Sequence, residues 1–179
     1  HAGSNIWNAG GDTRQIKQAI IHPDYDNVSQ DYDIAVIILD EPFELGATIG
    51  SIKLVGSGEE PADGTDTTVI GWGFTQSDRT VLPEALQEVT IPVISRTTCE
   101  DAYGSLFTAH MFCAGLANGS MDSCGGDSGG PSFNRVDGEF QLLGVTSWGL
   151  ECASDDYPAV FVDLANADVA SWVRANANI

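Results

Sequence analysis

Basic residues are scarce in this sequence. It contains 7 Lys and Arg against 26 Asp and Glu, which gives a formal net charge of −19. A surface this negative repels nucleic-acid phosphates and anionic lipid headgroups, so neither nucleic acid nor a membrane is expected as a partner. No apolar run approaches the length of a bilayer span. The 179 residues, 42% of them hydrophobic, have the composition of a globular protein and the length of about one domain.

Cysteine is also limited, to Cys99, Cys113, Cys124 and Cys152. No two of them have the short CxxC spacing of zinc or thioredoxin-type sites, so no metal and no cofactor is expected. An even number of cysteines favours two disulfides in a non-reducing compartment, and hence a secreted protein, over four reduced and buried thiols. Four cysteines allow three pairings, and the residues alone do not choose among them.

What the sequence does contain is an all-β pattern. Apolar runs of strand length, separated by turn residues, recur as barrels and sandwiches require. The expected strands lie at 15–25, 33–39, 67–74, 86–94, 141–149 and 158–164. Only the C-terminus predicts a helix, where Asn166 is a suitable N-cap and Val169, Trp172 and Val173 form one apolar stripe.

The segment 122–131, DSCGGDSGGP, is the strongest candidate for chemistry. It has two interpretations, a glycine-rich surface loop or the loop of a nucleophilic serine. In the second, the small neighbours of Ser128 allow the N–H groups of Gly126 and Ser128 to converge on the oxyanion of a tetrahedral intermediate. A serine hydroxyl is a weak nucleophile by itself, so this interpretation requires a base and a carboxylate that orients the base.

This segment and six others give the chain a close resemblance to the trypsin-like (chymotrypsin-fold) serine endopeptidases. The matching motifs, in family order and spacing, are DIAVIIL, VIGWGF, LQEVTIPVISRTTC, MFCAG, DSCGGDSGGP, TSWG and PAVFVDL. The resemblance implies an all-β chymotrypsin-like double β-barrel with a C-terminal helix and the active site between the barrels. It also implies the pairings Cys99 with Cys113 and Cys124 with Cys152.

The resemblance assigns the central site residues one by one. Ser128 matches the nucleophile, Asp33 matches the carboxylate that orients the base, and Gly126 and Ser128 match the oxyanion hole. Asp122 matches the floor of the primary specificity pocket, which selects Arg or Lys because a buried carboxylate would otherwise be left unpaired. Asp127 matches the residue that pairs with the new α-amino group after zymogen cleavage in active relatives.

The walls of the substrate cleft are assigned in the same way. Ser147, Trp148 and Gly149 match the wall against which an extended peptide binds, with Gly149 offering backbone hydrogen bonds. Ala159 stands where trypsins carry a glycine beside the pocket. Its methyl group is expected to crowd a long cationic side chain, which bears on the choice between Arg and Lys.

The catalytic histidine of the family has no counterpart in this sequence. The three histidines, His1, His22 and His110, fall outside the family's Ala-Ala-His-Cys context and are expected to be structural or solvated. By the resemblance, residues 1–179 form a trypsin-like domain that lacks its N-terminal part, about half of the first barrel. We therefore expect the chain alone to be inactive, with the histidine supplied upstream or by a second chain.

These observations predict a secreted serine endopeptidase that cleaves peptides after Arg or Lys through an acyl-enzyme. The alternative is a non-catalytic serine protease homologue that uses the cleft around Trp148 and Gly149 to bind a peptide or protein. A pseudoprotease would usually carry substitutions within the triad, whereas Ser128, Asp33 and Asp122 are all present here. The protease interpretation is therefore favoured.

Overall fold

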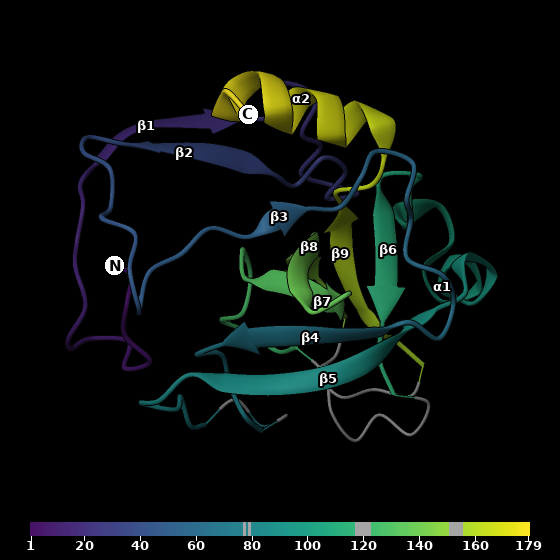
Figure 1. Cartoon of the computed structure of the whole chain (residues 1–179). Helices are drawn as coiled ribbons and strands as arrows, with labels where there is room; N and C mark the ends of the chain where they lie inside the picture. The colour runs from purple at the N-terminus through teal and green to yellow at the C-terminus, as the bar shows by residue number, and fades with distance from the viewer. Residues whose placement is uncertain (77, 79, 117–122, 151–155) are drawn as a thin grey trace.

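The computed structural model describes residues 1–76, 78, 80–116, 123–150 and 156–179. Most of the regular secondary structure is β, in two separate sheets, with a helix near the C-terminus (Figure 1). This confirms the predicted all-β class with a C-terminal helix. No helix among these residues has both the length and the apolar character needed to cross a membrane.

The larger sheet closes into a six-stranded barrel. Its strands follow the order β8-β7-β4-β5-β6-β9, and pairing of β9 back onto β8 closes the ring. The short β3 adds to β8 as a parallel edge strand. The bounds are β3 Lys53–Leu54, β4 Asp66–Gly71, β5 Gln87–Ile94, β6 Met111–Ala114, β7 Pro131–Val136, β8 Glu139–Trp148 and β9 Ala159–Asp163.

The smaller sheet is a two-stranded antiparallel ribbon. It pairs β1 (Ile16–Ile21) with β2 (Ala35–Leu39), and helix α2 (Ala167–Ala177) lies alongside it (Figure 1). Much of this ribbon is exposed, including Ile16, Ile21 and Ile37. A two-stranded ribbon is marginally stable without further packing, so the contacts that join it to the barrel and α2 matter for the site.

The core occupies the interior of the barrel and its contact with α2. Alternate residues of the strands point inward, and fully buried side chains such as Ile91, Leu143 and Phe161 come from three different strands. The residues of this core are Val55, Val69, Ile91, Val93, Phe112, Ala114, Leu143, Ala159, Phe161, Val162, Leu164, Ala165, Val169 and Val173.

The predicted C-terminal helix is confirmed together with its cap. The Asn166 side chain accepts hydrogen bonds from the N–H groups of Asp168 and Val169, which satisfies two of the unpaired donors of the first turn. The expectation that only the C-terminus is helical was wrong. A second helix, α1 (Arg96–Tyr103), begins at the N-cap Ser95 and continues into the 3₁₀ turn η1 (Gly104–Leu106).

Candidate functional site

Ser128 lies in the loop that leads into β7. Gly126 and Gly129 on either side of it have φ values of +100° and +81°, which residues with a side chain rarely adopt. Glycine at these positions lets the loop turn tightly and present its backbone. The Ser128 hydroxyl oxygen lies 3.5 Å from the carbonyl oxygen of Ser147, in β8.

Asp33 lies just before β2 and also contacts Ser147. A tight turn surrounds it, in which the Ile34 N–H donates to the Tyr32 carbonyl at 2.7 Å. The Ser147 hydroxyl donates to Asp33 Oδ2 at 2.6 Å. Ser147 therefore bridges the two residues that the sequence assigned as nucleophile and orienting carboxylate. Asp33, Ser128 and Ser147 come from three separate segments of the chain and meet at one place.

Asp127 binds a different set of partners from Asp33 and Ser147. Its carboxylate accepts the Gly73 N–H at 2.8 Å and the Cys124 N–H at 2.9 Å. A side chain at Gly71 or Gly73 would overlap this carboxylate, which explains the two glycines of the GWG segment. Asp127 thus joins the Ser128 loop to the chain that follows β4.

The resemblance assigns two N–H groups of the Ser128 loop, those of Gly126 and Ser128, to the oxyanion hole. The Asp127 N–H donates to the Cys124 carbonyl at 3.1 Å. Within the described residues, the N–H groups of Gly126 and Ser128, which flank it, have no acceptor. A pair of open donors beside a serine hydroxyl is the arrangement that stabilises a developing oxyanion.

A cavity of about 650 Å³ separates the ribbon from the barrel. Asp33 and Ser128 both line it, and the rest of its wall is mostly apolar. The apolar lining includes Ala35 of β2, Leu142 of β8 and Val173 of α2. The two assigned catalytic side chains therefore face one shared space between the sheets.

The assigned cleft wall is partly described. Trp148 ends β8, and its ring packs edge-on against Tyr103 with centroids 4.7 Å apart. Ala159 opens β9 and is 3% exposed, and a side chain at Gly149 would contact its Cα at 3.9 Å. Asp122, assigned as the pocket floor, lies outside the described residues.

The structure confirms one of the implied disulfides. Cys99 of α1 is bonded to Cys113 of β6, with Cα atoms 6.4 Å apart, so the bridge fixes α1 against the barrel. Cys124 is also disulfide-bonded. Its implied partner, Cys152, lies outside the described residues.

All three histidines contact groups other than Ser128 and Asp33. His1 Nε2 lies 2.6 Å from the Gly10 carbonyl oxygen. His22 is 6% exposed and stacks on Tyr32, and its Nδ1 accepts the Asp24 N–H at 3.2 Å. Burial, and to a lesser extent the neighbouring His110, lowers the pKa of His22. A buried neutral imidazole that accepts a backbone hydrogen bond has a structural role.

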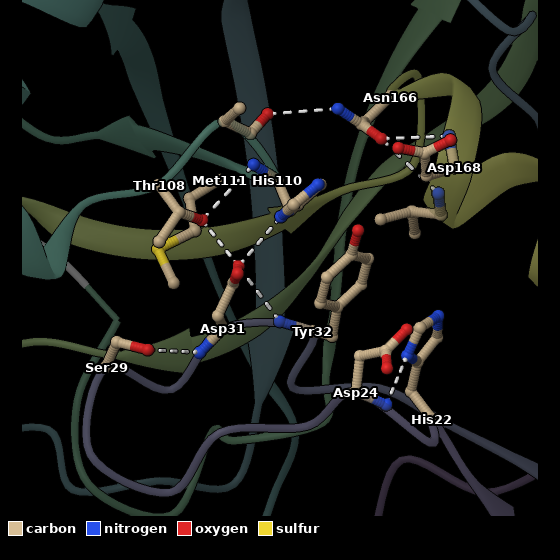
Figure 2. A network of polar contacts seen from close by, with 12 residues as sticks. His22, Asp24, Ser29, Asp31, Tyr32, Thr108, His110, Met111, Asn166 and Asp168 are labelled. Carbon is tan, nitrogen blue, oxygen red and sulfur yellow. Dashed lines mark hydrogen bonds and ion pairs between the residues drawn. The ribbon is translucent and has the colours of Figure 1, made fainter.

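A polar cluster forms around Asp31, two residues before Asp33 in the chain, and was not predicted from the sequence; Figure 2 shows its side chains. Asp31 Oδ1 accepts hydrogen bonds from Thr108 Oγ1 at 2.5 Å and from the Tyr32 N–H at 3.1 Å, and lies 2.9 Å from His110 Nδ1. Tyr32 has a φ of +50°, a left-handed backbone that costs a residue with a side chain about 1–2 kcal/mol. The only sequence signal was the acidic run DYD, which by itself is typical of a solvated turn.

The described residues contain no group of three or more His, Cys, Asp or Glu side chains placed to hold a metal ion.

Comparison with known proteins identifies the family. The family model described as Trypsin matches residues 2–173. The chain is 38% identical over 179 residues to a trypsin of Phaedon cochleariae, covering 99% of this chain and 67% of that protein. It is 39% identical to Trypsin Blo t 3 of Blomia tropicalis, covering 93% and 62%. It is 35% identical to a vitellin-degrading protease of Bombyx mori, covering 97% and 64%.

The chain thus spans about two thirds of the length of these relatives. The family match covers both sheets and the first part of α2, and includes the segments that bring Asp33, Ser128 and Ser147 together. The chain belongs to the trypsin family of serine proteases.

Proposed function

We propose that this chain forms the larger part of a secreted serine endopeptidase that cleaves after Arg or Lys. The observation that carries the proposal is the bridge made by Ser147. Its hydroxyl binds Asp33 at 2.6 Å, and its carbonyl oxygen lies 3.5 Å from the Ser128 hydroxyl. An imidazole between Asp33 and Ser128 completes the geometry that acyl transfer by a serine requires.

In the proposed reaction, Ser128 Oγ attacks the carbonyl carbon of the scissile peptide bond while a histidine accepts its proton. Asp33 holds this histidine and stabilises its protonated form. The N–H groups of Gly126 and Ser128 bind the oxyanion of the tetrahedral intermediate. The C–N bond then breaks as the histidine returns the proton to the amine, and water releases the acyl group from Ser128 by the same steps.

The histidine of this reaction comes from outside the 179 residues. Three observations support this. Each histidine of the chain is bound elsewhere, the cavity between ribbon and barrel is open beside Asp33 and Ser128, and about one third of the length of the relatives lies outside the part matched here. The missing group arrives on an upstream segment or on a second chain that fills this cavity. The 179 residues alone are inactive.

The proposed specificity rests on Asp122 and Ala159, which the family resemblance assigns to the floor and the side of the primary specificity pocket. Ala159 is buried at the start of β9, next to Gly149. Because the resemblance places a glycine here in trypsins, we expect the methyl group of Ala159 to narrow the space for a substrate side chain. We expect Ala159→Gly to raise kcat/KM for Lys and Arg substrates. Asp122→Asn should abolish the preference for a cationic residue, because the negative charge that pairs with it is lost.

The experiment compares the chain alone with the chain joined to its upstream segment. Both are treated with an Arg ester and with an organophosphate that labels activated serines. We expect hydrolysis and labelling of Ser128 only in the extended protein, and loss of both in Ser128→Ala. The variant Ser51→Ala, in an exposed loop, is the matched control and should keep full activity.

Labelling of Ser128 in the 179 residues alone would contradict the proposal that the base lies elsewhere. An extended protein that is folded, hydrolyses nothing and takes no label, but binds an Arg peptide, would contradict the protease and support the alternative, a non-catalytic serine protease homologue that binds peptides.

A further inference from the structure

Three stacked aromatic rings join the ribbon to the barrel (Figure 2). The Tyr32 ring lies between His22, at 4.2 Å, and His110, at 3.9 Å, with interplanar angles of 9° and 28°. We call His22, Tyr32 and His110 the ring stack. His22 follows β1, Tyr32 precedes β2, and His110 precedes β6 of the barrel. The stack therefore connects the two sheets at the point where the chain enters β2.

Asp31 provides the polar half of the same connection. Its Oδ1 accepts a hydrogen bond from Thr108 Oγ1 and lies 2.9 Å from His110 Nδ1. Thr108 and His110 both lie in the segment that leads into β6 of the barrel. Because a carboxylate only accepts, the proton of the imidazole facing it is on Nδ1. The two side chains are 20% and 16% exposed, so water competes weakly for this contact. The Asn166 amide donates to the Ala109 carbonyl, which fixes the same barrel segment to the start of α2.

The residues that contact the barrel, Asp31 and Tyr32, directly precede Asp33 in the chain. Asp31 is two residues before it, and Tyr32, with its left-handed φ of +50°, sets the direction in which the chain reaches it. The hydrogen bond that closes the tight turn from Tyr32 to Ile34 fixes the orientation of Asp33 relative to Tyr32. On its far side, Asp33 meets the Ser147 hydroxyl of β8. The barrel therefore holds the Asp33 segment from two directions.

We propose that His110 is a positioning residue for the catalytic carboxylate. By donating to Asp31 while its ring packs on Tyr32, it places Asp33 against Ser147 and so sets the orientation of the base that Asp33 holds. The proposal rests on the proposed protease function and adds to it a residue from the barrel that contacts neither substrate nor base. The hydrogen bond from Nδ1 to Asp31, rather than ring packing alone, is the essential contact.

Two substitutions separate these contributions. His110→Phe keeps a ring against Tyr32 and removes the donor. His110→Asn removes the ring and keeps an amide N–H close to the place of Nδ1. Both are made in the extended protease and assayed with an Arg p-nitroanilide, with kcat expressed per titrated active site.

We expect His110→Phe to lower kcat at least tenfold with KM within twofold of the parent. The acid limb of its kcat/KM profile should move to lower pH, because a displaced Asp33 stabilises the protonated base less well. His110→Asn should keep kcat within threefold. Equal losses in both variants, or an unchanged pH profile in His110→Phe, would mean that His110 only stabilises the fold, and would overturn the proposal.

A second measurement needs no catalysis and uses the 179-residue chain. His110→Phe and Ser147→Ala are combined, and unfolding equilibrium constants are measured in urea. If His110 places Asp33 on Ser147, the double variant departs at least threefold from the product of the single effects. In the control, Lys53→Ala, which removes an exposed ion pair of β3, takes the place of Ser147→Ala. The unfolding constant of this double variant should equal the product of the two single effects.

Simple multiplication for His110→Phe with Ser147→Ala overturns the proposal whatever the kinetics. An extended protease that shows no activity contradicts the proposed function instead, and the unfolding measurement then decides the positioning role alone.

Discussion

The carboxylate of Asp127 occupies the space that a side chain at Gly73 would need. The Gly73 N–H donates to Asp127 Oδ1 at 2.8 Å, and a Cβ on Gly73 would lie 2.6 Å from the same oxygen. Glycine at position 73 and aspartate at position 127 are therefore required together. Because Asp127 precedes Ser128, any displacement of its carboxylate is passed to the nucleophile and to the N–H groups beside it.

Gly73→Ala should therefore both destabilise the protein and disturb the Ser128 loop. The overlap lies between a Cβ and a short, hydrogen-bonded side chain, and forcing such an overlap costs about 1–3 kcal/mol. We expect the free energy of unfolding, measured in urea, to fall by about this amount. In the extended protease, labelling of Ser128 by an organophosphate should slow as well.

Gly50→Ala is the matched control for this change. Gly50 is exposed and does not adopt a positive φ, and a Cβ added to it would have no neighbouring atom within 4 Å. Alanine there should raise the free energy of unfolding by about 0.4–1 kcal/mol, because it restricts the unfolded chain. Equal effects of the two substitutions would contradict the role given to the contact between Gly73 and Asp127.

Two neighbouring hydroxyl groups in β8 make a second test. The Ser147 hydroxyl donates to Asp33, whereas the buried Thr146 hydroxyl has no hydrogen-bond partner in the described part of the chain. Ser147→Ala should lower the free energy of unfolding by about 1.5–3 kcal/mol, the usual range for a hydrogen bond to a charged group. Thr146→Val has nearly the same shape and removes a buried group without a partner, so stability should stay the same or rise.

Both variants are compared by urea unfolding at pH 7. If Thr146→Val costs as much as Ser147→Ala, the hydrogen bond to Asp33 contributes nothing specific, and the loss reflects disturbed packing of β8.

The sequence predicted β4, β5, β8 and β9 of the barrel because each contains a run of apolar residues of strand length. It did not predict β6, which has only four residues, or β7, whose sequence PSFNRV is half polar and has one fully buried residue. It did not predict α1, because the segment RTTCEDAY is mostly polar and only Cys99 and Tyr103 are buried from it. The helix forms because Ser95 caps it and the disulfide of Cys99 fixes it to β6. These are tertiary effects that local propensity does not report.

The same distinction applies to the site. Ser128 and Asp33 were found from motifs, and the structure brings both to Ser147. The cluster around Asp31 was not found, because its partner Thr108 lies 77 residues away in sequence. An acidic residue in a turn has no sequence feature that reveals a distant hydroxyl or imidazole as its partner.

Acidification should destabilise the chain through His22. Burial lowers its pKa from 6.5, the nearby His110 lowers it further, and Asp24 and Asp31 oppose this effect. The unfolded chain then binds more protons than the folded one at pH values below 6.5. The contribution of His22 to the free energy of unfolding is therefore complete above pH 6.5 and is lost as the pH falls through the folded pKa of His22.

The measurement is urea unfolding between pH 7.5 and 5. His22→Asn keeps an oxygen that can accept the Asp24 N–H but removes the titrating ring. The other two histidines remain in both proteins, so the difference between the two curves isolates His22. The parent should lose more stability on acidification than the variant, and parallel curves would contradict the assignment.

Asp163 should produce the opposite pH dependence. It is 1% exposed at the end of β9, and its Oδ1 accepts the Ala165 N–H at 2.8 Å. Burial is the largest cause that raises its pKa above 3.8, and Glu60 adds to this, while the N–H groups of Ala165 and Asn166 and the charge of Arg96 oppose it. Between pH 3.8 and the raised folded pKa, Asp163 therefore keeps a proton in the folded chain that it has released in the unfolded chain.

The favourable contribution of this proton is complete below pH 3.8 and is lost as the pH rises through the folded pKa of Asp163. Asp163→Asn keeps an oxygen acceptor for the Ala165 N–H and stays neutral at every pH. The stability of the variant relative to the parent should therefore rise with pH from about 3.8 and level off once Asp163 is ionised in the folded parent. Urea unfolding of both proteins at intervals from acid to neutral pH measures this difference. A constant difference, or one that favours the parent increasingly as the pH rises, would show that burial does not make ionisation of Asp163 costly.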